Sequence, residues 1–398
     1  MKNNTSYDQK GSKINIIQAL LKNGPMSRIE LTRFTNLSRA TISATVAELM
    51  DSELVQETSS QYSTGGRPAT LINLTPHSRV IVGADYSNQT WTLGAFDLLG
   101  NTVKEVTIPV SDSTIETVIQ SLVTSLEHFI DQLVEKPIEL IGLGMPGLVD
   151  VNRGVIVSAS NIGWYNVEIV KKIKERMNWE VVAINRHRAR GLAECRFGVG
   201  KDFGEIVYIG IGTGIAAGLF HNRQILFGAI GGAGELGHIT VDPNGPWCPC
   251  GNNGCLQQLA TSSAMEQELR RMLRSGKVSS IYPDSSYDLQ LIKSADIGKG
   301  ADEGDQLCME VVEKAATYLG IAMANLINIV NPETIILGGT VPMESEYYIK
   351  VATDVMHRRA LSPLNSNVQV LRASQNDLGG ALGAANFALD QHVGTISF

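Results

Sequence analysis

Three of the five cysteines, Cys248, Cys250 and Cys255, fall within eight residues, and His238 lies ten residues before the first of them. Three thiolates and one imidazole match the number and softness of ligands that tetrahedral Zn²⁺ prefers. The prolines and glycines between them favour turns, which a chain needs to bring four ligands onto one ion. Because no coordination position would stay open, the pattern predicts a structural zinc site. Free buried thiols are the alternative.

A second group of polar side chains has the chemistry to read DNA. Hydroxyl and cationic residues alternate with alanines along 38–50, where apolar residues recur at helical spacing. Small neighbours would let this helix approach base edges, and an Arg beside glycines in a polar loop could enter a narrow minor groove. A plain three-helix bundle with a flexible surface loop is the alternative. The predicted DNA contacts are Ser38, Arg39, Thr41, Ser43 and Thr45 on the helix and Gly66 and Arg67 in the loop.

These side chains need a scaffold, and residues 13–75 predict one. Apolar residues at helical spacing cover 13–21, and Asn23-Gly24-Pro25 ends that helix. Ser27 with Glu30 three residues later forms a capping box for a second helix. After the helix at 38–50, segments 54–57 and 69–74 read as two strands around a polar loop. The order predicts a winged helix-turn-helix.

The rest of the chain shows the same pattern twice. Two strands around a turn open each half, and both halves continue with buried strands and helices, which predicts a duplicated α/β fold with a ligand cleft between two lobes. The predicted strands cover 80–85, 91–97, 140–144, 181–184, 206–210, 215–219 and 334–337, and the predicted helices cover 114–134, 186–196 and 308–330.

Six motifs along this body carry a family resemblance: GMPGLVD at 144–150, NIGW at 161–164, IGIGTGIAAG at 209–218, GELGH at 234–238, CPCGNNGC at 248–255 and ILGG at 336–339. Over nearly its whole length the chain resembles the ROK family (repressors, open reading frames and sugar kinases) of the actin-like ATPase superfamily. The resemblance implies a two-lobed actin-like (ribonuclease H-like) body. It also implies the family's repressor branch of xylose and N-acetylglucosamine repressors, because the kinases lack a DNA-binding head. The four predicted zinc ligands match the ROK zinc motif.

The resemblance also implies where a ROK sugar kinase would keep its general base, the Asp of an Asn-Asp-Ala-Asn motif after the strand at 181–184. Here the sequence reads NRHR at 185–188, so Arg186 replaces that Asp, and a guanidinium stays protonated at neutral pH. The first phosphate loop, Asp-x-Gly-x-Thr in the kinases, reads DYSNQ at 85–89 and lacks the glycine. We therefore predict no catalytic residue and no kinase activity. A hexose kinase with an unusual base is the competing enzyme interpretation.

The family's sugar pocket is partly retained. Asn161, Asn185, Glu235 and His238 match positions that bind sugar hydroxyls or support the binding loop, whereas Arg186 and Gln257 stand where the family has carboxylates. We expect all six positions to contact an effector. Both replacements make the cleft less negative, which favours an anionic effector, a sugar phosphate or sugar acid, paired with Arg186 or Arg188. The alternative is that Arg186 pairs with a nearby carboxylate and fills an unused pocket.

Composition and charge agree with a DNA-reading head on a larger body. The 398-residue chain is 43% hydrophobic and 18% charged, which excludes a disordered chain. Residues 1–80 hold nine Lys/Arg and six Asp/Glu, whereas residues 81–398 hold 24 and 34. The sequence has no apolar run of about 18 residues and its N-terminus is too polar for a secretory signal, so we expect a cytoplasmic protein without membrane contact.

The combined prediction is a sugar-responsive transcriptional repressor that binds double-stranded operator DNA as a homodimer or a dimer of dimers. Control by a protein partner, as in some ROK repressors, is an alternative. We expect a head at 1–78, a first lobe at 79–195 to which a C-terminal helix at 380–398 returns, and a second lobe with the zinc loop at 196–379. The small-residue face of the helix at 308–330 could form an interface, but we expect it to pack inside its lobe.

Overall fold

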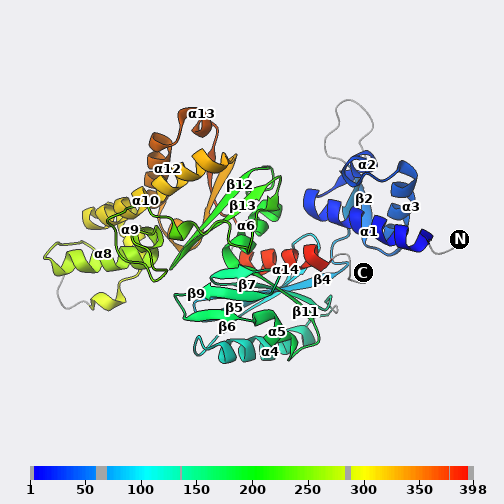
Figure 1. The fold of residues 1–398 in the computed structure, drawn as a ribbon, viewed down its shortest axis with the longest axis horizontal. Coiled ribbons are helices and arrows are strands. Elements are labelled where there is room, and N and C mark those ends of the chain that lie inside the picture. The colour runs from blue at the N-terminus through cyan, green and yellow to red at the C-terminus, as the bar shows by residue number, and fades with distance from the viewer. Residues whose placement is uncertain (1–3, 60–69, 135–136, 283–287, 376, 393–398) are drawn as a thin grey trace.

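The computed structural model describes residues 4–59, 70–134, 137–282, 288–375 and 377–392. Along the longest axis of the molecule, the N-terminal head lies at one end and the helices of the second half lie at the other (Figure 1). Within the described residues there are two three-stranded and two five-stranded sheets. None of the described helices is long and apolar enough to cross a bilayer.

The head has the predicted helices and wing strands. Ser27 caps the second helix in a complete capping box with Glu30, and Ser38 caps the third by accepting a hydrogen bond from the amide of Thr41. A short additional strand pairs Met26 with Ile72, so the sheet order is β1-β3-β2. The elements are α1 (Asn4–Asn23), β1 (Met26–Ser27), α2 (Arg28–Thr35), α3 (Arg39–Asp51), β2 (Val55–Ser59) and β3 (Thr70–Leu74).

The two five-stranded sheets repeat one topology, which confirms the predicted duplication. The first has the order β6-β5-β4-β7-β11 and the second the order β14-β13-β12-β15-β16, and in each the first three strands are antiparallel and the last two parallel. Their bounds are β4 (Val80–Ser87), β5 (Thr90–Asp97), β6 (Thr102–Pro109), β7 (Leu140–Met145) and β11 (Glu180–Asn185), then β12 (Ile206–Ile211), β13 (Ile215–His221), β14 (Gln224–Ile225), β15 (Thr334–Gly338) and β16 (Gln369–Arg372).

Helices cover both faces of the first sheet. The apolar face of α4 (Ile115–Asp131) packs on one side, and α14 (Gly379–His392) packs on the other, where it contacts β4 and β7 (Figure 1). The approach of α14 is so close that a Cβ on Gly142 would lie 1.9 Å from the carbonyl oxygen of Ala384. The predicted C-terminal helix thus returns to this sheet, and its last six positions, 393–398, lie outside the described residues. Beyond β7, the strands β8 (Leu148–Asp150), β9 (Val155–Ala159) and β10 (Trp164–Val167) form a small sheet beside α5 (Ile169–Lys174).

The second sheet has its own helical layer. The small-residue face of α10 packs inside it as expected, since a Cβ on Gly320 would lie 2.5 Å from the carbonyl oxygen of Ala352 on α12. The helices after β14 are α7 (Gln257–Ala260), α8 (Ser262–Arg274), α9 (Ser294–Asp302), α10 (Gln306–Val330), α11 (Thr340–Glu344), α12 (Glu346–Arg359) and α13 (Ser362–Asn365).

Helix α6 (Arg186–Phe197) lies between the two sheets and contacts β7 and β11 of the first and β12 and β13 of the second. The chain passes to the second sheet just after α6 and returns at 373–378. The buried carboxylate of Glu194 holds both passages. It accepts hydrogen bonds from the amide of Val199 (3.1 Å) on the outgoing segment and from the amides of Ser374 (2.7 Å) and Gln375 (2.6 Å) on the returning one.

We predict that Glu194→Ala lowers the free energy of unfolding of the body by about 2 kcal/mol, because it removes a buried acceptor and leaves the half-buried or exposed amides of Val199, Ser374 and Gln375 without it. All four tryptophans lie in the body, so their fluorescence during urea unfolding reports on this part of the chain. Glu127→Ala, at an exposed position of α4, is the control and should change the value by less than about 0.5 kcal/mol. Equal effects of the two variants would show that Glu194 does not hold the passages together.

Candidate functional site

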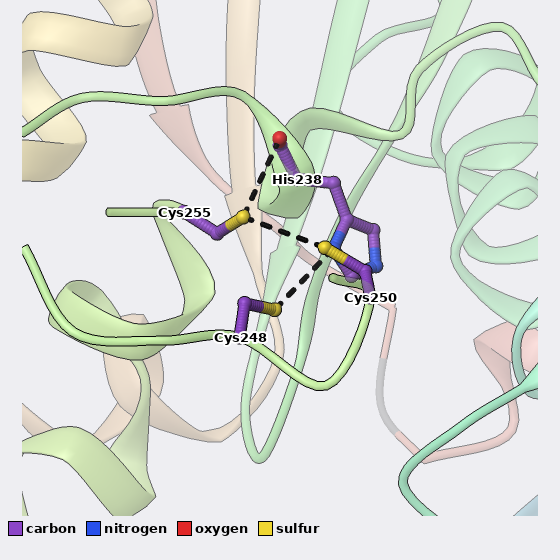
Figure 2. Close-up of side chains that lie close together, drawn as sticks. All are labelled: His238, Cys248, Cys250 and Cys255. Atoms are coloured by element: carbon purple, nitrogen blue, oxygen red, sulfur yellow. Dashed lines mark hydrogen bonds between the residues drawn. The ribbon is translucent and has the colours of Figure 1, made fainter. Parts of the chain in front are cut away.

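The four predicted metal ligands converge. One donor atom from each of His238, Cys248, Cys250 and Cys255 lies within 4.8 Å of all the others (Figure 2). The Sγ atoms of Cys250 and Cys255 are 3.7 Å apart, and Cys248 Sγ lies 3.8 Å from Nδ1 of His238. A tetrahedron with metal–sulfur bonds of about 2.3 Å has edges of about 3.8 Å, so the spacing of these donors suits one tetrahedral ion.

The loop that carries these ligands is built from tight turns. His238 ends a short 3-10 helix, Leu236–His238, and Thr240 pairs with Cys255 in an isolated β-bridge. Gly254 has a φ of 67°, and a Cβ there would lie 1.6 Å from the carbonyl oxygen of Asp242. Only glycine fits this position, because it combines left-handed backbone with a direct contact to another strand of the loop.

All six predicted effector positions line one cavity of about 290 Å³ between the two halves of the body: Asn161, Asn185, Arg186, Glu235, His238 and Gln257. Cys250 also lines it, so the metal-binding cluster forms part of the cavity wall. A second cavity of about 550 Å³ lies on the other side of Arg186 and His187, which line both spaces. Its wall includes glycines of the IGIGTGIAAG and ILGG motifs, at Gly212–Gly214 and Gly339.

Asn185 in the wall of the smaller cavity and Arg188, which is buried behind it, are already engaged in holding the fold. The side-chain oxygen of Asn185 caps α6 by accepting hydrogen bonds from the amides of His187 and Arg188, and its Nδ2 donates to the carbonyl of Gly147. The fully buried guanidinium of Arg188 donates to the carbonyl of Gly231 and lies 3.3 Å from Glu235. The guanidinium of Arg188 therefore serves to position Glu235 and its loop.

Arg186 does have a carboxylate neighbour. Its Nε lies 3.6 Å from Oδ1 of Asp85, and Arg190, one helical turn later, places a guanidinium nitrogen 3.0 Å from Oδ2 of the same carboxylate. Asp85 is nearly fully buried, so two cations share one buried anion. Burial lowers the pKa of His187 well below its usual value, and Arg186 and Arg190 lower it further, so this imidazole is neutral. Arg190 was not among the predicted site residues, although its spacing of four from Arg186 places both on one helix face.

In place of the first phosphate loop of the kinases, this chain has a tight turn without glycine. Asn88 and Gln89 both have positive φ, 49° and 56°, so β4 and β5 are joined by a tight two-residue turn. Tyr86 is buried and its ring stacks on Trp164 at a centroid distance of 5.6 Å. Tyr86 is thus committed to packing, whereas Ser87 and Asn88 line the larger cavity.

In the head, four of the predicted DNA-contacting residues lie at the start of α3 with exposed or half-buried side chains: Ser38, Arg39, Thr41 and Ser43. Thr45 was a wrong prediction, because only 4% of it is exposed and it faces the core. It lies three residues after Ile42 and four before Leu49, both of them core residues, and this spacing could have revealed the error. Ala44 is exposed in its place. Gly66 and Arg67 lie outside the described residues.

Comparison with known proteins identifies both the head and the body of this chain. A family model described as ROK family matches residues 81–391, and one described as winged helix-turn-helix DNA-binding matches residues 11–56. The chain belongs to the ROK family. Its ROK body is the duplicated actin-like fold that the sequence predicts, behind a winged helix-turn-helix head.

Relatives with and without such a head are similar to this ROK protein. The N-acetylglucosamine repressor of Escherichia coli O6:H1 is 32% identical over 92% of this chain and 88% of its own. A ROK family transcriptional regulator, homologous to the E. coli MLC protein, has a crystal structure that matches with a TM-score of 0.82 at 27% identity over 97% of both chains. A ROK glucokinase from Streptomyces griseus, solved with glucose and AMPPNP, matches with a TM-score of 0.70 at 25% identity over 78% of this chain and 99% of its own.

The pairing of Arg188 with Glu235 predicts a pH-dependent stability. Burial raises the pKa of Glu235, and Arg188 opposes that shift. In Arg188→Met the pKa of Glu235 in the folded state should rise further. A carboxyl group with a raised pKa destabilises the fold only at pH values at which it is ionised. We expect Arg188→Met to lose about 3 kcal/mol of unfolding free energy at pH 8 and clearly less at pH 5.

The control for this prediction is the double variant Arg188→Met/Glu235→Gln, measured by urea unfolding at both pH values. An amide does not titrate, so the double variant should lose the same free energy at pH 8 as at pH 5. A stability loss in the single variant that is independent of pH would contradict the pairing.

Proposed function

We propose that this ROK protein is a transcriptional repressor of carbohydrate genes that binds operator DNA through its head and a sugar or sugar-phosphate effector through its body. The single observation that carries the proposal is the pairing of Asp85 with Arg186 and Arg190, in a body joined to a winged helix-turn-helix. The N-acetylglucosamine repressor, a relative over nearly the whole chain, supports the same interpretation.

The charge arrangement argues against phosphotransfer. A sugar kinase needs a carboxylate to accept the proton of the attacking hydroxyl, and position 186 holds a guanidinium instead. A carboxylate held between two guanidiniums is also not free to hold the metal ion that accompanies a nucleotide. The tight turn at Asn88 and Gln89 leaves no glycine for close phosphate contact. We therefore propose that kinase activity is lost.

The same pairing bears on the effector. Arg186 and Arg190 bring two positive charges to one negative charge, and Arg186 lines the cavity that also holds Asn161, Glu235 and Gln257. An anionic group in this cavity would meet an incompletely neutralised cation, which favours a sugar phosphate or sugar acid. Arg188 is not a candidate because it is buried against Glu235 and Gly231.

The function is tested with the full chain by gel shift on the DNA upstream of its own gene, in the presence of neutral sugars and their 6-phosphates. We expect sequence-specific binding with a Kd of about 10⁻⁸ M or tighter, released by a phosphorylated sugar. Arg39→Ala should weaken binding by about tenfold, whereas Arg153→Ala, an exposed position on the body, should not. Sugar-dependent ATP turnover, or no binding to any duplex, would contradict the proposal. Tight binding of a plain neutral sugar would contradict only the anionic effector.

We further propose that His238, Cys248, Cys250 and Cys255 hold a structural Zn²⁺ ion. The donor set and its spacing support this, and the ion would leave no open position for chemistry. Because His238 and Cys250 also line the smaller cavity, the ion would fix the wall that carries Glu235.

Elemental analysis of the purified protein should find about one zinc ion per chain. Cys255→Ala should lose most of the metal and lower the thermal midpoint, whereas Cys195→Ala and Cys308→Ala, at the two cysteines remote in sequence from the cluster, should keep the metal. Full zinc content in Cys255→Ala would exclude this site.

Several further features of the proposed regulator remain predictions. Paired operator half-sites call for a homodimer or a dimer of dimers, and a protein partner could replace the sugar as the controlling ligand. Operator binding implies a cytoplasmic location. We propose that the chain divides into a head at 1–78, a first lobe at 79–195 with the C-terminal helix, and a second lobe at 196–379.

A further inference from the structure

The head is joined to the body by a short ordered link, Thr75–Arg79, between β3 and β4. Its central residue, His77, has a φ of 56°, which is uncommon for a residue with a bulky side chain. The amide of His77 donates to Oδ2 of Asp97 (3.3 Å), and its ring Nδ1 lies 3.5 Å from the same oxygen. The link is therefore fixed to the body at one carboxylate.

That carboxylate organises the turn between β5 and β6. Asp97 is fully buried and accepts hydrogen bonds from the amides of Leu99 and Asn101, both at 2.9 Å, and from the side chain of Asn101 at 2.9 Å. Three of its four hydrogen bonds hold its own turn and the fourth holds His77. A displacement of this turn must therefore displace the link or break the part-buried hydrogen bond between His77 and Asp97.

The same turn contacts the end of α6. A Cβ on Gly100 would lie 2.8 Å from the ring of Phe197, so the ring rests directly on the backbone of the turn. Phe197 is the last residue of α6, and the first residues of that helix, Arg186 and His187, line both cavities of the body. Apolar residues of the head, of β5, of α6 and of α14 belong to one continuous cluster.

We propose that Phe197 and the turn Asp97–Asn101 couple the effector cavity to the DNA-binding head. The proposal rests on the proposed function. A ligand that shifts the N-terminal end of α6 moves the helix as a rigid body, Phe197 transmits the shift to Gly100, and Asp97 transmits it to His77. Phe197, Asp97 and His77 are thus positioning residues that contact neither DNA nor effector. Packed elements of this kind pass on small displacements because their interiors are closely packed.

The coupling is tested first without any ligand, by hydrogen exchange of the full chain followed by mass spectrometry. In Phe197→Leu, the amides of His77, Leu99 and Asn101 should exchange about tenfold faster, because the turn that holds all three is loosened. Phe203→Leu is the matched control: Phe203 is also half-buried, just beyond α6, but packs in a different apolar cluster. Exchange at His77 that stays at the wild-type rate in Phe197→Leu would overturn the proposal, even if Leu99 and Asn101 become faster.

The second arm measures the ratio of operator affinities with and without the sugar or sugar phosphate found by gel shift. In Phe197→Leu and in Asp97→Asn, whose remaining carbonyl oxygen can still accept from the amides of Leu99 and Asn101 but not also from His77, this ratio should fall at least fivefold toward one, while effector affinity stays within about twofold. Phe203→Leu should keep the wild-type ratio. An unchanged ratio in both variants would overturn the coupling. If the wild-type chain binds no operator or responds to no effector, the proposed function fails, and the exchange measurement still decides whether α6 and the link are coupled.

Discussion

The buried carboxylate of Glu194 is the interaction on which the arrangement of the body depends. A carboxylate is stable in such a place only if hydrogen bonds replace its lost water, and its donors come from both segments that connect the two five-stranded sheets. The C-terminal end of α6 is therefore fixed to both lobes at once. The N-terminal end of the same helix is held by the pairing of Arg186 with Asp85, and Arg186 and His187 face the two cavities. The residues that face the cavities and the residue that holds the connecting segments thus lie toward opposite ends of a single helix of 12 residues.

The cationic residues of α6 bear on the proposed loss of phosphotransfer. Arg186 and Arg190 lie one turn apart and share Asp85, whereas Arg188 points elsewhere and holds Glu235 and Gly231. Arg186 and Arg190 compensate Asp85, which would otherwise be buried without a counter-charge at a cost of several kcal/mol, and Arg188 compensates the partly exposed Glu235. The ion pairs therefore stabilise the cleft in the same positions where a kinase would keep its reactive groups free. Retained glycine turns at 212–214 and 339 are consistent with this, because such turns also serve folding.

What the sequence could predict depended on how local the signal was. Cysteine spacing, capping residues and the repeated order of strands are local, and they predicted the metal-binding cluster, the head and the duplicated sheets. The partners of buried charges are set by tertiary contacts: nothing in the spacing of Arg186 pointed to Asp85, about a hundred residues earlier, or of Glu194 to Ser374. Asn185 lines the cavity, and the cap that its side-chain oxygen forms on α6 was not predicted. For Thr45, the helical period already placed the side chain toward the core, and the ability of its hydroxyl group to contact DNA was given too much weight.

The contact between head and body limits how such a protein can be regulated. If the head hung from a flexible linker, lobe movements would be lost before they reached DNA. Here the link is short, His77 is held at a buried carboxylate, and apolar residues of the head and of α6 share one cluster. Movement of the head must therefore involve repacking of that cluster, and a well-packed core has few alternative arrangements of similar energy. In the proposed coupling, a ligand acts by binding one of these arrangements more tightly than the others, and its effect is limited by that difference in affinity.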